Sequence, residues 1–463
     1  MNFKIIYIVL ILFCIIEIPF FYNNLILWDE SVYLGMGKYI YSNGELGLWE
    51  NLRPIIIPLI IGIFWKMNIN YIITSQIIAL LFSLATIIFT YHIAKELFDE
   101  KIAIIAAILL IINPLYIKHS TEIMTDILAT SLVLFGIILF NKKEYLFSGI
   151  FCSIGFLTKY PAGIIFFSLL IYMLYKKHNL YNLRNIIIGF LILLILFLII
   201  NQNFYGDALL PLKNASTYQS NKSFSKIGIY NIGFYFIELI KQSYIYLLSL
   251  IGIIFILKNK NKKLIILIIP LFLYLIYFTY ITMKHSRYIM LFISFIVILT
   301  SKGIFEIYNK IKINKILKNY YYITIILLLL PTILQDYNLI NIQITREPSK
   351  VIEVHDFLGK YNNVLTTDPV IVAYKDIKII PYYYSILSAE EVYNKNKANI
   401  DAILFTKDPF PCEQGMMGYA QEQINNCINI RERLFNTILN ENKLVFNKTI
   451  DEQTYYIFEP ILA

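Results

Sequence analysis

Charged residues are scarce in this chain. Asp, Glu, Lys and Arg make up 15% of its 463 residues, whereas hydrophobic residues make up 58% and the mean hydropathy is +0.63. Repeated apolar runs of roughly 17 to 20 residues are long enough to cross a bilayer as helices. This composition excludes a soluble globular protein and predicts an all-α polytopic membrane protein.

We expect about eleven transmembrane helices. They are predicted over residues 3–22, 71–92, 102–118, 122–140, 145–158, 160–175, 185–201, 240–257, 264–281, 288–306 and 320–335. No small-residue cleavage site follows the first run, so we interpret it as an anchor and not as a removed signal peptide. The apolar run 54–65 is short for a span and predicts an interfacial or re-entrant helix.

Lys and Arg in the short loops predict the orientation, because such residues concentrate on the cytoplasmic side. Basic loops at 142–143, 176–184, 258–263 and 310–318 place the N-terminus in the cytoplasm. Residues 23–70 then form an outer loop on the extracytoplasmic face of the cell membrane. The first 335 residues carry a net charge of +14, which we assign to these loops and to anionic membrane lipid, not to nucleic acid.

The composition changes after about residue 335. Residues 336–463 contain 12 Lys and Arg against 17 Asp and Glu, a net charge of −5. They predict a small extracytoplasmic α/β domain, with helices over 351–358 and 428–440 and strands over 363–374, 400–406 and 455–458.

Cysteine is rare too, with four residues in the chain. Cys14 and Cys152 fall in predicted helices. Cys412 and Cys427 lie in the C-terminal domain and could form a disulfide, a pairing that the sequence leaves open.

Ionisable residues gather at the predicted outer ends of the helices. They are Asp29, Glu30 and Arg53 in the first outer loop, Glu122 and Asp126 before the fourth span, Lys159 after the fifth, and Lys284, His285, Arg287 and Tyr288 before the tenth. Glu122 and Asp126 are four residues apart and share one helix face, so they require a cation, a shared proton or a metal. Ionisable groups near a bilayer need partners, which favours one common site.

Each group also has a purely structural explanation. The acidic residues could cap helices or interact with helix dipoles, Lys159 could extend to the interface, and the basic turn at 284–287 could be an ordinary loop. Taken together, the groups favour chemistry. Lys159, Lys284 and Arg287 could bind a lipid-linked phosphate, and a carboxylate could deprotonate an acceptor hydroxyl. This set indicates glycosyl transfer from a polyprenyl-phosphate sugar.

The order of these motifs resembles GT-C glycosyltransferases, and most of all the protein O-mannosyltransferase and aminoarabinose-transferase branch. The resemblance covers about residues 1–335 and rests on Trp28-Asp29-Glu30-x-x-Tyr33, Arg53-Pro54, Glu122…Asp126, Gly155-Phe-Leu-Thr-Lys159-Tyr, Asn203-Phe-Tyr-Gly206-Asp and Lys284-x-x-Arg287-Tyr288. The acidic pair after the first span is its most specific element.

The resemblance implies an inverting transferase that moves a monosaccharide from a polyprenyl or dolichyl phosphate to a protein, lipid or glycan. Asp29 would be the catalytic residue, with Glu30 organising the loop. Asp126, together with Glu122, would form a second acidic site, and the donor-binding residues would be Arg53, Lys159, Lys284, His285, Arg287 and Tyr288. The chain has no Trp-Trp-Asp sequence, which argues against an oligosaccharyltransferase.

The sequence leaves open whether the site binds a divalent metal ion. The four carboxylates with His119 or His285 could bind one, but no ligand spacing is diagnostic, and no cofactor is assigned. Two other functions compete. A transporter or lipid flippase would need a site at mid-membrane and typically internal repeats, and we find no repeat. A non-enzymatic scaffold or receptor would be built around the C-terminal domain.

Overall fold

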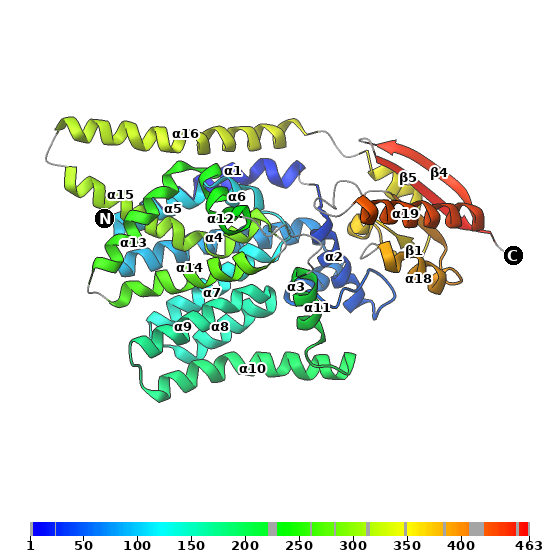
Figure 1. Cartoon of the computed structure of the whole chain (residues 1–463), viewed down its shortest axis with the longest axis horizontal. Helices are drawn as coiled ribbons and strands as arrows, with labels where there is room; N and C mark the ends of the chain where they lie inside the picture. Colours follow the sequence, from blue (N-terminus) through cyan, green and yellow to red (C-terminus); the bar gives the residue numbers. More distant parts are fainter. Residues whose placement is uncertain are drawn as a thin grey trace.

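The computed structural model describes residues 3–23, 25–220, 229–259, 262–281, 284–311, 315–346, 350–382, 386–406, 421–450 and 453–461. It has a helical part and a C-terminal domain that contains a sheet (Figure 1). In Figure 1, α16 runs along the upper edge of the helical part and α10 along its lower edge, while the C-terminal domain lies at one end.

Helices form over every predicted span. They are α1 (Phe3–Asn23), α4 (Tyr71–Leu97), α5 (Glu100–Ile111), α6 (Pro114–His119), α7 (Thr125–Asn141), α8 (Tyr145–Thr158), α9 (Ile164–Tyr175), α10 (Leu180–Tyr205), α13 (Ser249–Lys258), α14 (Ile265–Tyr280), α15 (Ile293–Ile311) and α16 (Lys315–Thr345). The 3₁₀ turns η1 (Tyr160–Gly163), η3 (Tyr244–Leu248), η4 (Lys262–Leu264) and η5 (Ser286–Leu291) precede four of these helices.

Four helical segments in the described part of the chain are long and apolar enough to cross a membrane. They are Tyr71–Leu97, Leu180–Tyr205, Lys262–Tyr280 and Asn319–Thr345, judged by length and composition. Other apolar helices, among them Thr125–Asn141 and Tyr145–Thr158, are shorter. The protein is therefore a multi-pass membrane protein, and the number of eleven spans stays a prediction.

Close helix packing in the helical part depends on glycine. A Cβ on Gly149 of α8 would lie 2.1 Å from the Ile186 carbonyl oxygen of α10, and a Cβ on Gly189 of α10 would lie 2.0 Å from the Leu146 carbonyl oxygen of α8. Both positions exclude any side chain, so the two backbones touch directly, as small residues allow in membranes.

Four further helices of the described residues lie wholly or mostly outside the predicted spans. α2 (Trp28–Tyr41) and α3 (Ile56–Lys66) follow α1 and pack on each other. With 11 residues α3 is short for a span, and its interfacial or re-entrant position stays a prediction. α11 (Leu210–Ser220) follows α10, and α12 (Ile229–Gln242) precedes η3. We made no prediction for α11 or for the first part of α12.

The C-terminal domain contains a five-stranded sheet in the order β2-β1-β3-β5-β4. Its elements are α17 (Ile352–Leu358), β1 (Asn363–Thr366), η6 (Pro369–Ala373), β2 (Lys378–Pro381), α18 (Ile386–Asn396), β3 (Ala402–Phe405), α19 (Gln421–Glu441), β4 (Asn442–Ile450) and β5 (Gln453–Pro460). β1 is parallel to β2 and β3, while β5 is antiparallel to β3 and β4. α18 and α19 cover one face, and α17, η6 and α2 contribute to the core on the other.

The predicted elements of this domain need correction at several points. The strand predicted over 363–374 ends at Thr366, because Asp368 caps η6 by accepting a hydrogen bond from the Val370 backbone N–H at 2.9 Å and Pro369 begins the turn. β2, α18 and β4 were not predicted. Cys427 is disulfide-bonded, and Cys412 lies outside the described residues.

Candidate active site

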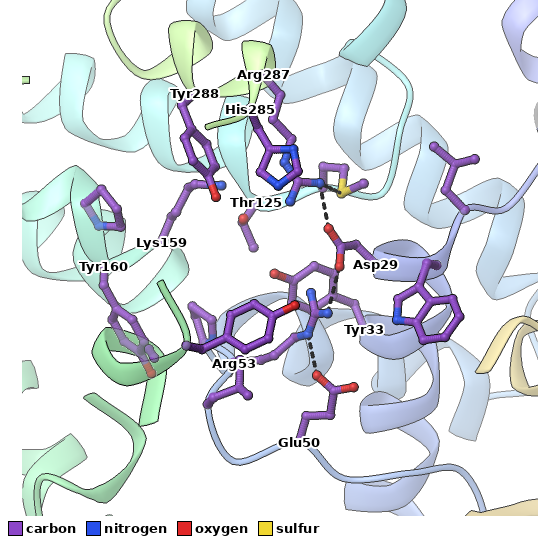
Figure 2. A pocket seen from close by; sticks show the side chains of 18 residues that line it. Asp29, Tyr33, Glu50, Arg53, Thr125, Lys159, Tyr160, His285, Arg287 and Tyr288 are labelled. Carbon is purple, nitrogen blue, oxygen red and sulfur yellow. Dashed lines mark hydrogen bonds and ion pairs between the residues drawn. The ribbon is translucent and has the colours of Figure 1, made fainter. Parts of the chain in front are cut away.

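A cavity of about 530 Å³ lies where loops and helix ends of the helical part meet. Side chains come from the first turn of α2, the loop before α3, the start of α7, the α8–α9 turn and the turn between α14 and α15 (Figure 2). Those labelled there are Asp29, Tyr33, Glu50, Arg53, Thr125, Lys159, Tyr160, His285, Arg287 and Tyr288. Segments more than 250 residues apart in sequence therefore share one cavity.

Asp29 lies between two arginines. Its Oδ1 is 2.7 Å from Arg53 Nη2, and its Oδ2 accepts a hydrogen bond from Arg287 Nη1 at 2.6 Å. Arg53 Nε also donates to Glu50 Oε2 at 2.7 Å. Burial alone would raise the pKa of Asp29, but the two guanidinium groups hold it well below its usual range. The carboxylate is thus ionised, and it is a weak base while both arginines contact it.

Lys159 supplies a third cation on another wall of the cavity. Its Nζ lies 2.7 Å from Asp126 Oδ1 and 5.1 Å from the centre of the Tyr288 ring. Both side chains of the ion pair are almost fully buried, with 11% and 3% of their surface exposed. Asp126 is behind Lys159 and is not among the residues that line the cavity. Asp126, predicted for the second acidic site, is therefore the ion-pair partner of Lys159.

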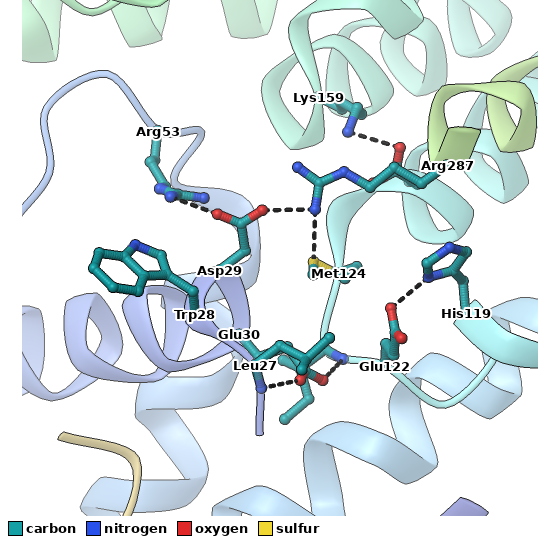
Figure 3. Close-up of polar contacts among 12 residues, drawn as sticks. Leu27, Trp28, Asp29, Glu30, Arg53, His119, Glu122, Met124, Lys159 and Arg287 are labelled. Carbon is teal, nitrogen blue, oxygen red and sulfur yellow. Dashed lines mark hydrogen bonds and ion pairs between the residues drawn. The ribbon is translucent and has the colours of Figure 1, made fainter. Parts of the chain in front are cut away.

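Glu30 and Glu122 lie below Asp29, behind the cavity lining (Figure 3). The Glu30 carboxylate accepts hydrogen bonds from the Leu27 backbone N–H at 2.6 Å and from the Ile123 backbone N–H at 2.7 Å. It thereby joins the loop before α2 to the loop before α7. Glu122 pairs with His119 Nδ1. Burial, followed by the nearby Glu122 carboxylate, raises the pKa of Glu30 to about 8.

The structure thus divides the predicted site residues. Asp29, Arg53, Lys159, His285, Arg287 and Tyr288 line one cavity. Lys284 does not, since its Nζ donates to the backbone carbonyls of Phe278 and Thr279 at the end of α14. Glu30, predicted as a catalytic residue beside Asp29, and Glu122, predicted for the second acidic site, also lie outside the lining of this cavity.

Several residues of the cavity were missed. Glu50 precedes Arg53 by three positions, a spacing that could have indicated the pair. Tyr218 reaches the cavity from α11, a helix that we did not predict. Within the described ranges, no group of three or more His, Cys, Asp and Glu residues is arranged to hold a metal ion.

Comparison with known proteins identifies the fold. Residues 52–202 match the PMT_2 family, dolichyl-phosphate-mannose-protein mannosyltransferase. ArnT from Cupriavidus metallidurans bound to undecaprenyl phosphate has a TM-score of 0.65 and 9% identity, with 100% of this chain and 99% of that chain covered. The chain has the GT-C fold. The predicted resemblance is therefore confirmed, and the match to ArnT extends over the C-terminal domain as well.

A second group of GT-C structures is also similar. The Archaeoglobus fulgidus oligosaccharyltransferase in its apo form has a TM-score of 0.58 and 14% identity, covering 91% of this chain and 72% of that chain. Its complex with an inhibitory peptide and a dolichol-phosphate has a TM-score of 0.56 and 12% identity, with the same coverage. No curated protein gives a significant sequence match. At these identities the likeness shows the fold alone.

Proposed function

We propose that the protein is a glycosyltransferase that moves a monosaccharide from a polyprenyl or dolichyl phosphate to a hydroxyl acceptor on a protein, lipid or glycan. The observation that carries this proposal is the Arg53–Asp29–Arg287 arrangement in a cavity that Lys159 also lines. The match to the mannosyltransferase family and the GT-C fold support the same reaction class. The basic inner loops support an extracytoplasmic site.

The donor phosphate would bind to the cations. Arg287 and Arg53 can offer paired N–H groups to phosphate oxygens, and Lys159 adds a point charge. In the described site each of these cations already has a carboxylate partner: Asp29 for both arginines, Glu50 for Arg53 and Asp126 for Lys159. A phosphate must therefore compete with carboxylates for the cations.

This competition makes Asp29 a stronger base. When phosphate oxygens take over Arg287, Asp29 loses a stabilising partner and gains an anionic neighbour, and both changes raise its pKa. Asp29 then accepts the proton of the acceptor hydroxyl as that oxygen attacks the anomeric carbon. The bond from this carbon to the phosphate oxygen breaks, and polyprenyl phosphate leaves with the electron pair, stabilised by the cations. Attack opposite the leaving group inverts the anomeric configuration.

The proposal is tested by transfer from a panel of polyprenyl-phosphate sugars, with cell-derived acceptors present. Release of free polyprenyl phosphate by the wild type but not by Asp29→Asn would support the reaction class and identify the sugar. Failure of the purified wild type to bind or release any donor, together with substrate-dependent flux in vesicles, would instead support the flippase alternative.

A further inference from the structure

The helix that carries Asp29 is buried on all sides. Every residue of α2 from Glu30 to Lys38 is buried. Tyr33 and Leu34 pack with residues of α3 and α7 in the helical part. Val32 and Met36 belong instead to the core that covers one face of the C-terminal sheet. Helix α2 therefore depends on both parts of the protein, and Figure 1 shows it between them.

A buried lysine joins α2 to the C-terminal domain. Lys38 is fully buried, and its Nζ lies 2.7 Å from Asp376 Oδ1 and donates to the Lys375 carbonyl oxygen at 2.9 Å. Trp65 Nε1, at the end of α3, donates to the same Asp376 oxygen at 3.0 Å. The Tyr71 hydroxyl of α4 donates to the Ala373 carbonyl oxygen at 2.6 Å. The segment from η6 to β2 is thus held by three helices of the other part.

The backbone makes a second connection. The Gly47 N–H, in the loop after α2, donates to the Ile377 carbonyl oxygen at 2.8 Å, and its own carbonyl accepts from the Ile379 N–H at 2.8 Å. This loop therefore extends the sheet beyond β2. Gly35 of α2 sits so close to η6 that a Cβ there would lie 2.7 Å from Val372 Cγ1. Glycine at this position therefore lets α2 approach η6 more closely than a residue with a side chain would.

We propose that the C-terminal domain is a positioning element of the donor site, which holds α2 so that Asp29 meets Arg53 and Arg287. The inference rests on the proposed function. In this role the domain differs from a separate acceptor-binding module, because its contacts described above lie on α2, α3 and α4. These contacts would fix Asp29 relative to Arg53 and Arg287. Displacing a reacting group by about 1 Å lowers turnover by roughly a hundredfold.

The test uses one substitution that pushes α2 away from the C-terminal domain and a second substitution that restores the space between them. Gly35→Ala places a methyl group 2.7 Å from Val372 Cγ1, with Leu48 Cγ as the next nearest atom at 3.1 Å. Val372→Ala removes the closest of these contacts. Gly233→Ala on α12 is the matched control, since a Cβ there has only an ordinary contact at 3.6 Å. In the full-length protein we would measure kcat, KM for donor and acceptor, and hydrogen exchange of the α2 amides.

We expect Gly35→Ala to lower kcat by about 10- to 100-fold without raising the KM for donor or acceptor by more than about twofold. Exchange of the α2 amides should accelerate, and adding Val372→Ala should restore both kcat and protection. The inference is overturned if α2 protection is unchanged, if the defect lies in the acceptor KM, or if Val372→Ala restores nothing. A wild type that transfers no sugar would refute the proposed function alone, because hydrogen exchange still decides whether the domain holds α2.

Discussion

The position of Asp29 between two arginines predicts that its removal has opposite effects on binding and on turnover. The Asp29→Asn change should abolish transfer and yet tighten the binding of polyprenyl phosphate. In the wild type the phosphate must share Arg287 with a carboxylate whose oxygen is 2.6 Å from Nη1. In the variant Arg287 has lost this carboxylate partner, while Arg53 keeps its ion pair with Glu50.

The size of the effect follows from Coulomb's law. Two anions on the same guanidinium, about 5 Å apart, repel by about 3 kcal/mol at an effective dielectric constant of about 20. The Asp29 side chain is 21% exposed, and solvent screening reduces the repulsion to about 1.4 kcal/mol. This corresponds to roughly tenfold tighter binding.

The assay is titration of the purified protein with undecaprenyl phosphate in detergent, followed by the change in intrinsic tryptophan fluorescence, to which Trp28 in the cavity lining contributes. Asp207→Asn is the matched control, because Asp207 also pairs with a cation, Lys213 at 2.7 Å, but is not among the cavity residues. Equal or weaker binding by Asp29→Asn would refute the view that Asp29 and the phosphate compete for the same arginines.

Three other substitutions test the surroundings of Asp29. Lys159→Met leaves the buried Asp126 without its cation, so we expect thermal unfolding to show a loss of stability of about 3–5 kcal/mol. The double variant with Asp126→Leu should recover most of this stability but not the binding of the donor. Arg287→Lys keeps the charge but loses the paired N–H groups, so polyprenyl phosphate should inhibit this variant only at concentrations about tenfold higher than those that inhibit the wild type. Unchanged inhibition would remove Arg287 from the phosphate site. The pKa of Glu30 is raised from 4.5 to about 8 in the folded protein, so between these pH values the folded protein keeps a proton that the unfolded chain releases. The stability of the wild type should therefore fall as the pH rises from about 4.5 to about 8. Glu30→Gln should flatten this pH dependence of the melting temperature, and an unchanged slope would assign it to another group.

The helices could be predicted well because long apolar runs carry a strong signal. The short helix over 56–66 was also predictable, since its length is insufficient for a span. Prediction was weaker in the C-terminal domain, where strands of four residues such as β1 and β2 are too short to show a clear alternation. Their positions depend on pairing with distant strands and with the loop at Gly47.

The candidate site was predictable by residue type but not by geometry. Asp29, Arg53 and Arg287 were selected as candidates because ionisable residues near a membrane require partners. Which acid meets which cation depends on how helices hundreds of residues apart pack. For this reason the sequence could not show that Glu30 turns toward two backbone amides while its neighbour Asp29 enters the cavity.

The most direct test of the central claim is single-turnover transfer from a bound donor, with wild type beside Asp29→Asn at saturating polyprenyl-phosphate sugar. If Asp29 is the base, the variant should hold the donor at least as tightly as the wild type and transfer no sugar. Transfer at the wild-type rate would contradict the account and assign the base to another residue.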